Sequence, residues 1–224
     1  MAERRERILA AAQQIIGERG YQALTMRDLA RAGRVTVPTI YNLIGPKEAV
    51  LFAAVGYRTD NYVARLAASE GRPPCERVLA IVDACVDEFL SLPQYYRSML
   101  GLIYASRSAS SMRLRTSHAV REPIAGALAE LAAARGLAAW VDARSLASQI
   151  ESLVQVASLR WATGSLADEE LRSAAMHGTA LMLLAVTSGS QRVSLEEIAR
   201  KSQAQSQGRA SRPAESAEPL RSSS

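Results

Sequence analysis

A short stretch near the N-terminus concentrates side chains that can bind phosphate oxygens and the edges of bases. Residues 34–50 read RVTVPTIYNLIGPKEAV, in which Tyr41, Asn42 and Lys47 carry a phenol, an amide and an ammonium group. Phenols and ammonium groups suit phosphate oxygens, and an asparagine amide can form two hydrogen bonds with adenine. Such groups can act together only if a rigid element presents them on one surface.

The pattern before this stretch predicts two helices. Apolar residues at helical spacing on one face indicate an amphipathic helix over residues 3–19, and Gly20 supplies its end. Thr25 and Asp28, three residues apart, form a capping-box signal for a second helix that runs to about Arg31. Gly33 then allows a sharp turn.

A third, very short helix carries the polar side chains of the opening stretch. Thr36 starts it, and Pro38 falls in its first turn, where a proline costs little. Gly45 and Pro46 end it near Leu43 and open the next helix. Three helices, the last two joined by a tight turn, make a helix-turn-helix unit, which we assign to residues 1–47.

Longer helices follow, and they predict a second, all-helical domain over residues 48–188. Gly, Pro and Ser clusters divide it into helices at about 47–69, 75–91, 93–106, 110–134, 142–163 and 168–188. Pro123 is expected to kink or split the fourth of these. Residues 189–224 are rich in Ser, Gln, Arg and Glu and predict a polar, disordered tail, with a helical turn or two within 194–203.

Composition and charge agree with an all-α protein that can bind nucleic acid. Of the 224 residues, 48% are hydrophobic but only 5% aromatic, which favours helices over sheets. The net charge is +5, and residues 1–47 hold eight basic and four acidic side chains, so most of the excess lies there. Such a charge permits phosphate binding without demanding it.

The same residues argue against several other classes of protein. Cys75 and Cys85 are the only cysteines, and with two histidines they favour small buried residues over a metal site or a disulfide framework. No catalytic constellation, phosphate-binding glycine loop or cofactor motif is present, so we expect neither an enzyme nor a cofactor. The apolar run at 180–186 is too short to cross a bilayer, and the charged start is unlike a secretion signal, which predicts a cytoplasmic protein.

The first 55 residues resemble the N-terminal domain of the TetR family of transcriptional regulators. The resemblance lies in "IL-A-A" in the first helix, "GY-A-T" before the second, "LA" within it, "TIY" in the third and "K-E-A-V" opening the fourth. It implies an all-α fold with an N-terminal three-helix helix-turn-helix DNA-binding domain and a C-terminal helical domain for ligand binding and dimerisation.

Two departures from the family pattern concern packing. The family usually has Ala-Gly at the bend between the second and third helices, where this chain has Gly33-Arg34. Arg34 therefore occupies a position where glycine's positive φ is normally used, which allows the bend to shift by one residue. The family's His-Phe after the tyrosine is Leu43-Ile44 here, so packing beneath the third helix is aliphatic.

The resemblance assigns DNA-binding roles to individual side chains. Matching the family's backbone-contacting positions, Thr25, Tyr41 and Lys47 are expected to contact phosphates. Tyr41 has packing as its alternative role, and Lys47 has that of a solvated charge. Base reading is expected on the exposed face of the third helix, from Thr36, Val37, Thr39 and Asn42, together with Arg27 and Arg34.

The last two long helices carry the pattern expected of a homodimer interface. One stripe has four-residue spacing and small residues, and the other is apolar throughout. An alternative is that both stripes pack inside the chain. The candidate interface residues are Leu146, Ile150, Leu153, Val154, Ala157, Trp161, Ala174, Gly178 and Met182.

The middle helices are expected to hold a small-molecule effector. Asp83 and His118 lie on apolar stripes, and a buried polar group needs a partner, either a ligand or a neighbour such as Arg97. Aromatic and methionine stripes can be core or pocket lining. The candidate ligand-binding residues are Asp83, Val86, Phe89, Tyr95, Met99, Ile103 and His118.

The expected function is a ligand-responsive repressor that binds a palindromic, double-stranded DNA operator and is released by a small, largely apolar molecule. The alternative is a helical DNA-binding or partner-binding protein without a ligand pocket. Whether a cavity of useful size lies in the helical domain distinguishes these two hypotheses.

Overall fold

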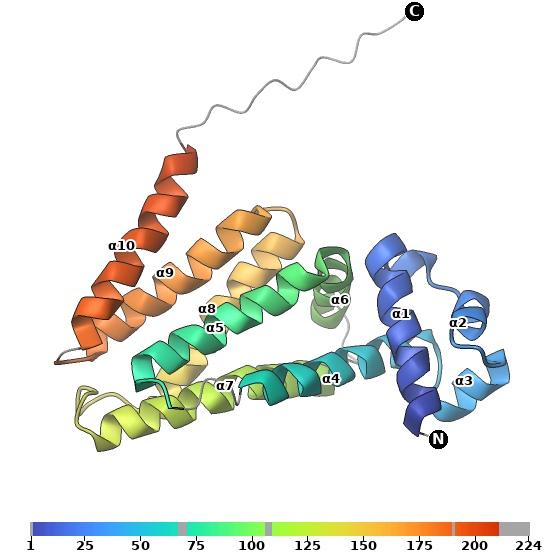
Figure 1. The fold of residues 1–224 in the computed structure, drawn as a ribbon, viewed down its shortest axis with the longest axis horizontal. Coiled ribbons are helices and arrows are strands. Elements are labelled where there is room, and N and C mark those ends of the chain that lie inside the picture. The colour runs from blue at the N-terminus through green and yellow to red at the C-terminus, as the bar shows by residue number, and fades with distance from the viewer. Residues whose placement is uncertain (1, 67–70, 106–108, 190, 211–224) are drawn as a thin grey trace, which may run out of the picture.

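The protein is built from ten α-helices, seen here in a computed structural model that describes residues 2–66, 71–105, 109–189 and 191–210 (Figure 1). None of these helices combines the length and apolar character that crossing a membrane would require. They are α1 (Ala2–Ala23), α2 (Met26–Ala32), α3 (Val37–Leu43), α4 (Lys47–Leu66), α5 (Pro74–Ser91), α6 (Pro93–Ala105), α7 (Ser110–Ala133), α8 (Ala143–Ala162), α9 (Asp168–Val186) and α10 (Gln191–Ala210).

The first three helices form a small unit, the head, at one end of the molecule (Figure 1). Its core consists of Ile8 and Ile16 of α1, Leu29 of α2 and Ile40 of α3, each fully buried. Gly20 takes a positive φ of 78° and kinks α1. The sequence predicted that the helix would end at this glycine, whereas it continues beyond the kink to Ala23. The three-helix prediction for this region is therefore confirmed.

The remaining helices form the body, and α4 connects it to the head. This helix starts beside α3 and runs into the body, where it packs on α7 and α5 (Figure 1). Helix α1 packs against both α4 and α6, and the Gln13 side-chain amide donates to the carbonyl of Ala54 at 3.1 Å. The head is thus seated on two helices of the body.

Helix α5 is central to the body because it packs on α4, α6, α7 and α9. Its buried face includes Val78, Ile81, Val82 and Val86, which explains the broad apolar surface in its sequence. Helix α8 packs on α6, α7 and α9, and its Trp161 is fully buried. Pro123 lies inside α7, which nevertheless runs as one helix, so the expected split is absent there.

Residues 191–210 form α10, which is longer than the helical turn or two that the sequence predicted within 194–203. This helix packs along α9 and buries Leu195 and Ala199, while Ala199 accepts a hydrogen bond through its carbonyl oxygen from His177 Nδ1 at 3.0 Å. Two buried apolar positions are enough to dock α10 on α9. They are too few to change the polar composition of the segment, which is why the composition predicted disorder. Residues 211–224 of the predicted tail lie outside the described residues.

Candidate nucleic-acid interface and internal cavity

Helix α3 buries one side in the head and presents the other to solvent. Ile40 is fully buried, and Val37, Leu43 and Ile44 pack around it on the core. Leu43 and Ile44 thus provide the aliphatic packing that the sequence predicts. The opposite side of this helix is therefore free to approach another molecule.

The outward face of α3 carries most, but not all, of the predicted base-reading side chains. Asn42 and Thr36 are exposed, and so is the Tyr41 ring, at 51%. Thr39 is half-buried, with its hydroxyl 2.8 Å from that of Thr36. Val37 is half-buried against the core, so less of it is available for a base than the sequence suggested.

Pro38 was missed by the sequence reasoning, although helical spacing identifies it. It is exposed and lies four residues before Asn42, so both side chains fall on the same side of α3. A proline ring there can make apolar contact with a thymine methyl group. In the sequence, this residue served only as a helix-start signal.

Capping interactions fix both helices of the helix-turn-helix. The Thr25 hydroxyl accepts from the Asp28 backbone N–H at 3.0 Å and donates to the Asp28 carboxylate at 2.7 Å, which confirms the predicted cap of α2. The Thr36 hydroxyl accepts from the Thr39 N–H at 3.4 Å and caps α3. Both threonines remain exposed.

The bend between α2 and α3 keeps its register and does not shift. Arg34 itself adopts the left-handed conformation, with φ 51°, while Gly33 has an ordinary φ of −77°. Gly33 is needed for a different reason: a Cβ there would lie 3.1 Å from the Leu29 carbonyl oxygen and 3.2 Å from Ile8 Cγ1. The glycine therefore permits close approach of α1, and the arginine carries the unusual φ.

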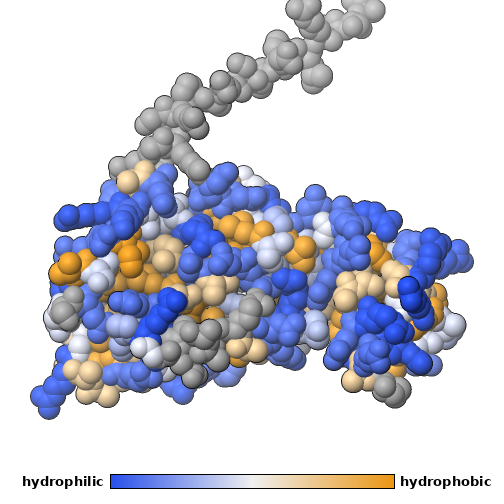
Figure 2. Space-filling model, viewed as in Figure 1, coloured by the Kyte–Doolittle hydropathy of each residue, from blue (hydrophilic) through white to orange (hydrophobic). Residues whose placement is uncertain are grey.

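Basic side chains surround this surface, but some also hold the head together. Arg27 and Arg34 are exposed. Arg7 Nε donates to the Gly33 carbonyl at 3.0 Å. Lys47 Nζ donates to the Gln22 carbonyl at 3.2 Å and lies 4.5 Å from the centre of the Tyr21 ring. Lys47 is thus more than a solvated charge. Figure 2 shows hydrophilic residues over much of the visible face of the head.

The body contains a cavity of about 100 Å³, partly open to solvent, between α4, α5, α6, α7 and α8. Phe89, Met99 and Ile103, three of the predicted ligand-binding residues, line it. Further apolar walls come from Val55, Leu100 and Val154.

Asp83 and His118 do not reach the cavity, contrary to the sequence prediction. Asp83 pairs instead with Arg172 of α9, and its side chain is 42% exposed. His118 is exposed on α7, with its Nδ1 3.6 Å from the Glu122 carboxylate. Both residues sit at the edge of an apolar stripe, where a long side chain can reach solvent or a neighbouring helix.

Val86 and Tyr95 are also absent from the cavity wall. Val86 is fully buried in the core on another side of α5. Tyr95 is fully buried and packs edge-on against Tyr96 at 5.1 Å between ring centroids. Burial raises the pKa of the Tyr95 phenol well above its usual range. Both residues therefore belong to the core, which for Tyr95 is the alternative that the sequence left open.

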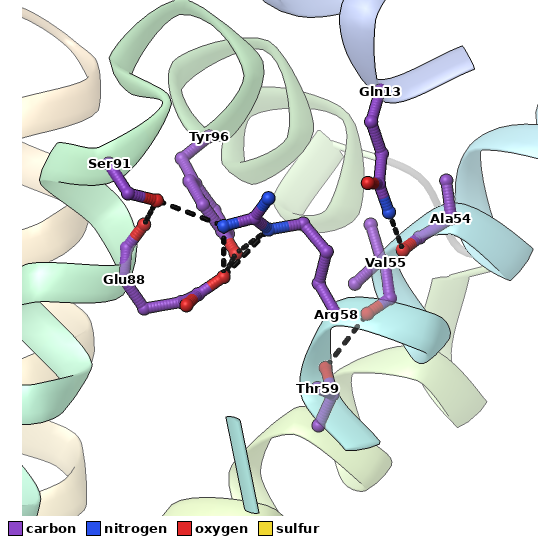
Figure 3. Close-up of polar contacts among 8 residues, drawn as sticks. All are labelled: Gln13, Ala54, Val55, Arg58, Thr59, Glu88, Ser91 and Tyr96. Atoms are coloured by element: carbon purple, nitrogen blue, oxygen red, sulfur yellow. Dashed lines mark hydrogen bonds and ion pairs between the residues drawn. The ribbon is translucent and has the colours of Figure 1, made fainter. Parts of the chain in front are cut away.

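An ion pair in the cavity wall belongs to a polar cluster that links three helices (Figure 3). Arg58 of α4 donates through Nε to Glu88 of α5 at 2.6 Å and to the Tyr96 hydroxyl of α6 at 2.8 Å. The Tyr96 hydroxyl in turn donates to Glu88, and the guanidinium also reaches Ser91 at 2.9 Å. Burial, followed by the Glu88 charge, raises the pKa of the Tyr96 phenol strongly.

The sequence reasoning missed this cluster and a second buried acid, Glu151 of α8. Glu88 and Glu151 are 9% and 5% exposed, and both line the cavity. Each carried a usable signal, because Glu88 lies three residues after buried Cys85, and Glu151 lies four after buried Ala147. A charged residue at helical spacing on a buried face indicates a partner or a binding site.

The predicted interface stripe on α8 packs inside the chain. Leu146, Ile150, Val154, Ala157 and Trp161 are at most 9% exposed in the single chain, so their apolar surface is already covered. These five residues of the stripe therefore pack within the chain, while Leu153, the sixth, is half-buried.

Gly178 of α9 faces Leu153 of α8 in the same chain. A Cβ at Gly178 would lie 2.7 Å from Leu153 Cδ1. The small residue thus permits close packing of α8 on α9 within one chain. Ala174 and Met182 are half-buried, and on the same two helices Val156 and Leu181 are 59% and 49% exposed.

Comparison with known proteins agrees with this architecture. Residues 8–58 match the family model described as bacterial regulatory proteins, tetR family. The HTH-type transcriptional regulator HbdR of Aromatoleum sp. (strain CIB) is 35% identical over 60 residues, which cover 27% of this chain and 26% of that protein. The chain thus matches about a quarter of that relative's length.

Solved structures extend the likeness to the whole fold. A TetR transcription regulator from Haloarcula marismortui superimposes with a TM-score of 0.72 at 18% identity, covering 84% of this chain and 100% of that chain. Thermus thermophilus FadR, a TetR-family repressor in complex with lauroyl-CoA, superimposes with a TM-score of 0.64 at 21% identity, covering 83% and 96%. Residues 8–58 thus match the tetR family of bacterial regulatory proteins, and the described chain shares its fold with these solved structures.

Proposed function

We propose that this protein is a DNA-binding transcriptional repressor, and not an enzyme, that leaves its operator when a small, largely apolar molecule fills the cavity of the body. The observation that carries the proposal is the course of α4. This helix begins at Lys47, beside α3, and its residues Val55, Arg58 and Tyr62 form part of the cavity wall. One rigid element therefore touches both the candidate DNA surface and the candidate ligand site.

The head supports the DNA-binding part of the proposal. In it, α3 enters a major groove with Asn42, Thr36 and Pro38 toward the bases, while Tyr41 and Thr25 contact phosphates. The excess of basic over acidic residues in 1–47 supplies sequence-independent attraction to phosphates. Because the DNA is chromosomal, we place the protein in the cytoplasm.

One head alone contacts too little DNA to bind it with high sequence specificity, so we propose that the protein acts as a homodimer. Two heads related by a two-fold axis contact half-sites about one helical turn apart, roughly 34–36 Å, on a palindromic operator. The outward side of α8 and α9 is the proposed interface, with Val156 and Leu181 at its centre and Ala174 and Met182 beside them. Apolar side chains this exposed on two adjacent helices gain from burial against a second copy.

Coupling between the sites follows from the packing of α4. The Arg58–Glu88–Tyr96 cluster ties α4 to α5 and α6. A ligand that enters the cavity contacts this cluster and favours a position of α4 that changes the spacing of the two heads. Operator affinity then falls by the ratio of the ligand affinities of the two states.

The alternative of a DNA-binding protein without a ligand predicts a body filled by side chains. The cavity and the buried Glu151 carboxylate favour a ligand, because a core filled by side chains would leave this carboxylate with little compensation.

The test is a gel-shift assay with the DNA that flanks the protein's own gene, repeated with a panel of small molecules. We expect a shift at low salt that weakens steeply as salt rises, and release by at least one apolar compound. Asn42→Ala should lower the preference for the flanking DNA over random DNA by about tenfold. An unchanged preference in this variant contradicts base reading by α3, and release by no compound favours the ligand-free alternative.

A further inference from the structure

The charges that line the cavity do not cancel, and the excess charge lies on α8. Among the described residues of the lining, three are charged: Arg58, Glu88 and Glu151. Arg58 and Glu88 form an ion pair with N–O separation of 2.5 Å, so their charges compensate each other. Glu151 remains, and it gives the cavity one negative charge in excess.

Glu151 is also poorly provided with hydrogen-bond donors. Its side chain is 5% exposed, and the donor that the described residues offer its Oε1 is the Gln155 amide, one turn further along α8. A buried carboxylate has about four acceptor sites and is costly to bury with so little compensation. Arg113, a cation on the neighbouring α7, is not in the cavity lining and donates to the backbone carbonyl of Ile103 at 2.6 Å.

Several hydroxyl groups of the lining already donate to backbone carbonyls, as Tyr62 does to Ile81 of α5 at 3.0 Å. Thr59 donates its hydroxyl to the Val55 carbonyl at 3.0 Å, and Ser158 donates to the Val154 carbonyl at 2.7 Å. Thr116 likewise donates to the carbonyl of Met112 at 3.1 Å. Glu151 therefore stands out as the acceptor that a ligand can satisfy.

The remaining walls suit the body of a lipophilic cation. Phe89, Tyr96, Met99 and Tyr104 line the cavity with Glu151. Aromatic faces attract cations as well as alkyl chains, whereas a second anion placed here would meet the uncompensated charge of Glu151.

We propose that the effector is a lipophilic amine, cationic at neutral pH, and that Glu151 is its counter-ion. The inference rests on the proposed function for its biological meaning, but it concerns binding to the cavity and can be tested without DNA.

Three compounds of equal chain length separate the possibilities: decylamine, 1-decanol and decanoate. At pH 7 an alkylamine is protonated and a fatty acid is ionised, so the three carry positive, neutral and negative head groups. Trp161 can report binding, because its ring stacks on Phe89 with centroids 6.2 Å apart. Trp140, the other tryptophan, is 81% exposed, so a Trp140→Phe background isolates the Trp161 fluorescence.

Decylamine is expected to bind at least about tenfold more tightly than 1-decanol, and decanoate more weakly than either, since a charged hydrogen-bonded pair is worth that much. Glu151→Gln should abolish the preference for the amine. Glu196→Gln is the matched control, because it removes the same charge from an exposed residue of α10, a helix outside the cavity wall, and should leave the ranking unchanged.

Equal binding of decylamine and 1-decanol, tighter binding of decanoate, binding of none of the three, or a preference that survives Glu151→Gln would each overturn the assignment. The ranking on the unsubstituted protein tests it even if Glu151→Gln fails to fold. A ranking led by decanol or decanoate would leave a ligand-responsive regulator standing, whereas the gel-shift assay decides that function separately.

Discussion

At the scale of single residues, Arg34 occupies a conformation that its side chain disfavours. A left-handed φ costs a residue with a Cβ roughly 1–2 kcal/mol, while glycine gives back about 0.5–1 kcal/mol through its more flexible unfolded chain. Arg34→Gly should therefore raise the free energy of unfolding by about 0.5–1 kcal/mol, measured by urea denaturation. It should also weaken DNA binding, because an exposed cation is lost.

Gly33→Ala is the contrasting substitution at the same bend. Its new Cβ would meet the Leu29 carbonyl oxygen and Ile8 Cγ1, so we expect a loss of about 1–3 kcal/mol. If Gly33→Ala stabilised the protein, Gly33 would not be needed for the close approach of α1. If Arg34→Gly destabilised it, the left-handed φ of Arg34 would not be the source of strain.

Lys47 allows a second prediction at the scale of single residues. The chain contains one other lysine, Lys201, which serves as its control. If the Lys47 ammonium contacts a phosphate, Lys47→Ala should reduce the slope of log affinity against log salt by about 1. Lys201→Ala removes the same charge from α10 and should leave the slope unchanged. Equal slopes in both variants would contradict a phosphate contact and leave Lys47 with only its contacts to Gln22 and Tyr21 within the head.

The two thiols should be unreactive in the folded chain. Burial, and then the charge of Glu76, raises the pKa of Cys75 to about 11, while burial, followed by Glu88 and Glu151, raises that of Cys85 to about 12. Both groups thus favour the folded state below their unfolded pKa, and this contribution is lost as pH rises toward 11–12. At pH 8 a thiol reagent should label both cysteines rapidly in urea and slowly without it; equal rates would contradict the burial.

At the scale of helices, start and stop residues made the head predictable, and periodicity made the body predictable as helical. Thr25, Thr36, Gly20 and Pro46 act locally, so their effect can be read without knowing the fold. Which neighbour covers an apolar stripe is not a local property. The stripe through Ile150 could face α7 and α9 or a second chain, and its sequence is the same in both cases.

The dependence of burial on neighbouring helices also explains which cavity residues the sequence predicted and which it did not. Phe89, Met99 and Ile103 were identified because their helices turn a wide apolar face inward. Glu88 and Glu151 were missed because a charge usually indicates a solvated face, and its burial depends on a partner from another helix or a ligand. The length of α10 was underestimated because two buried apolar residues suffice to dock it.

The proposed dimer interface can be tested on its most exposed apolar residue of α9. Leu181→Glu should convert the dimer to a monomer, measured by light scattering after gel filtration, because burying a carboxylate without a partner costs several kcal/mol. Val193→Glu on α10 is the control, since Val193 is 73% exposed. A dimer that survives Leu181→Glu would place the interface elsewhere.

At the scale of the whole molecule, the two sites should respond to each other by equal factors. The ligand must lower operator affinity by the factor by which operator DNA lowers ligand affinity, and typical coupling amounts to about 5–150-fold. The Arg58–Glu88 pair joins α4 to α5 in the cavity wall, whereas Arg115 joins α7 to α4 through an exposed pair with Asp60 at 2.6 Å. The buried pair, and not the surface pair, should carry the coupling.

Replacing both members of the buried pair, Arg58→Met with Glu88→Met, removes the pair without leaving an unpaired charge, so the chain should remain folded. This double variant should bind operator DNA and ligand separately, but the coupling factor between them should fall toward about 1. Arg115→Gln should retain the factor of the unsubstituted protein, since a surface pair contributes about 0–1 kcal/mol. A double variant that still releases DNA on ligand binding would mean that the signal reaches the heads by a route other than the polar cluster between α4, α5 and α6.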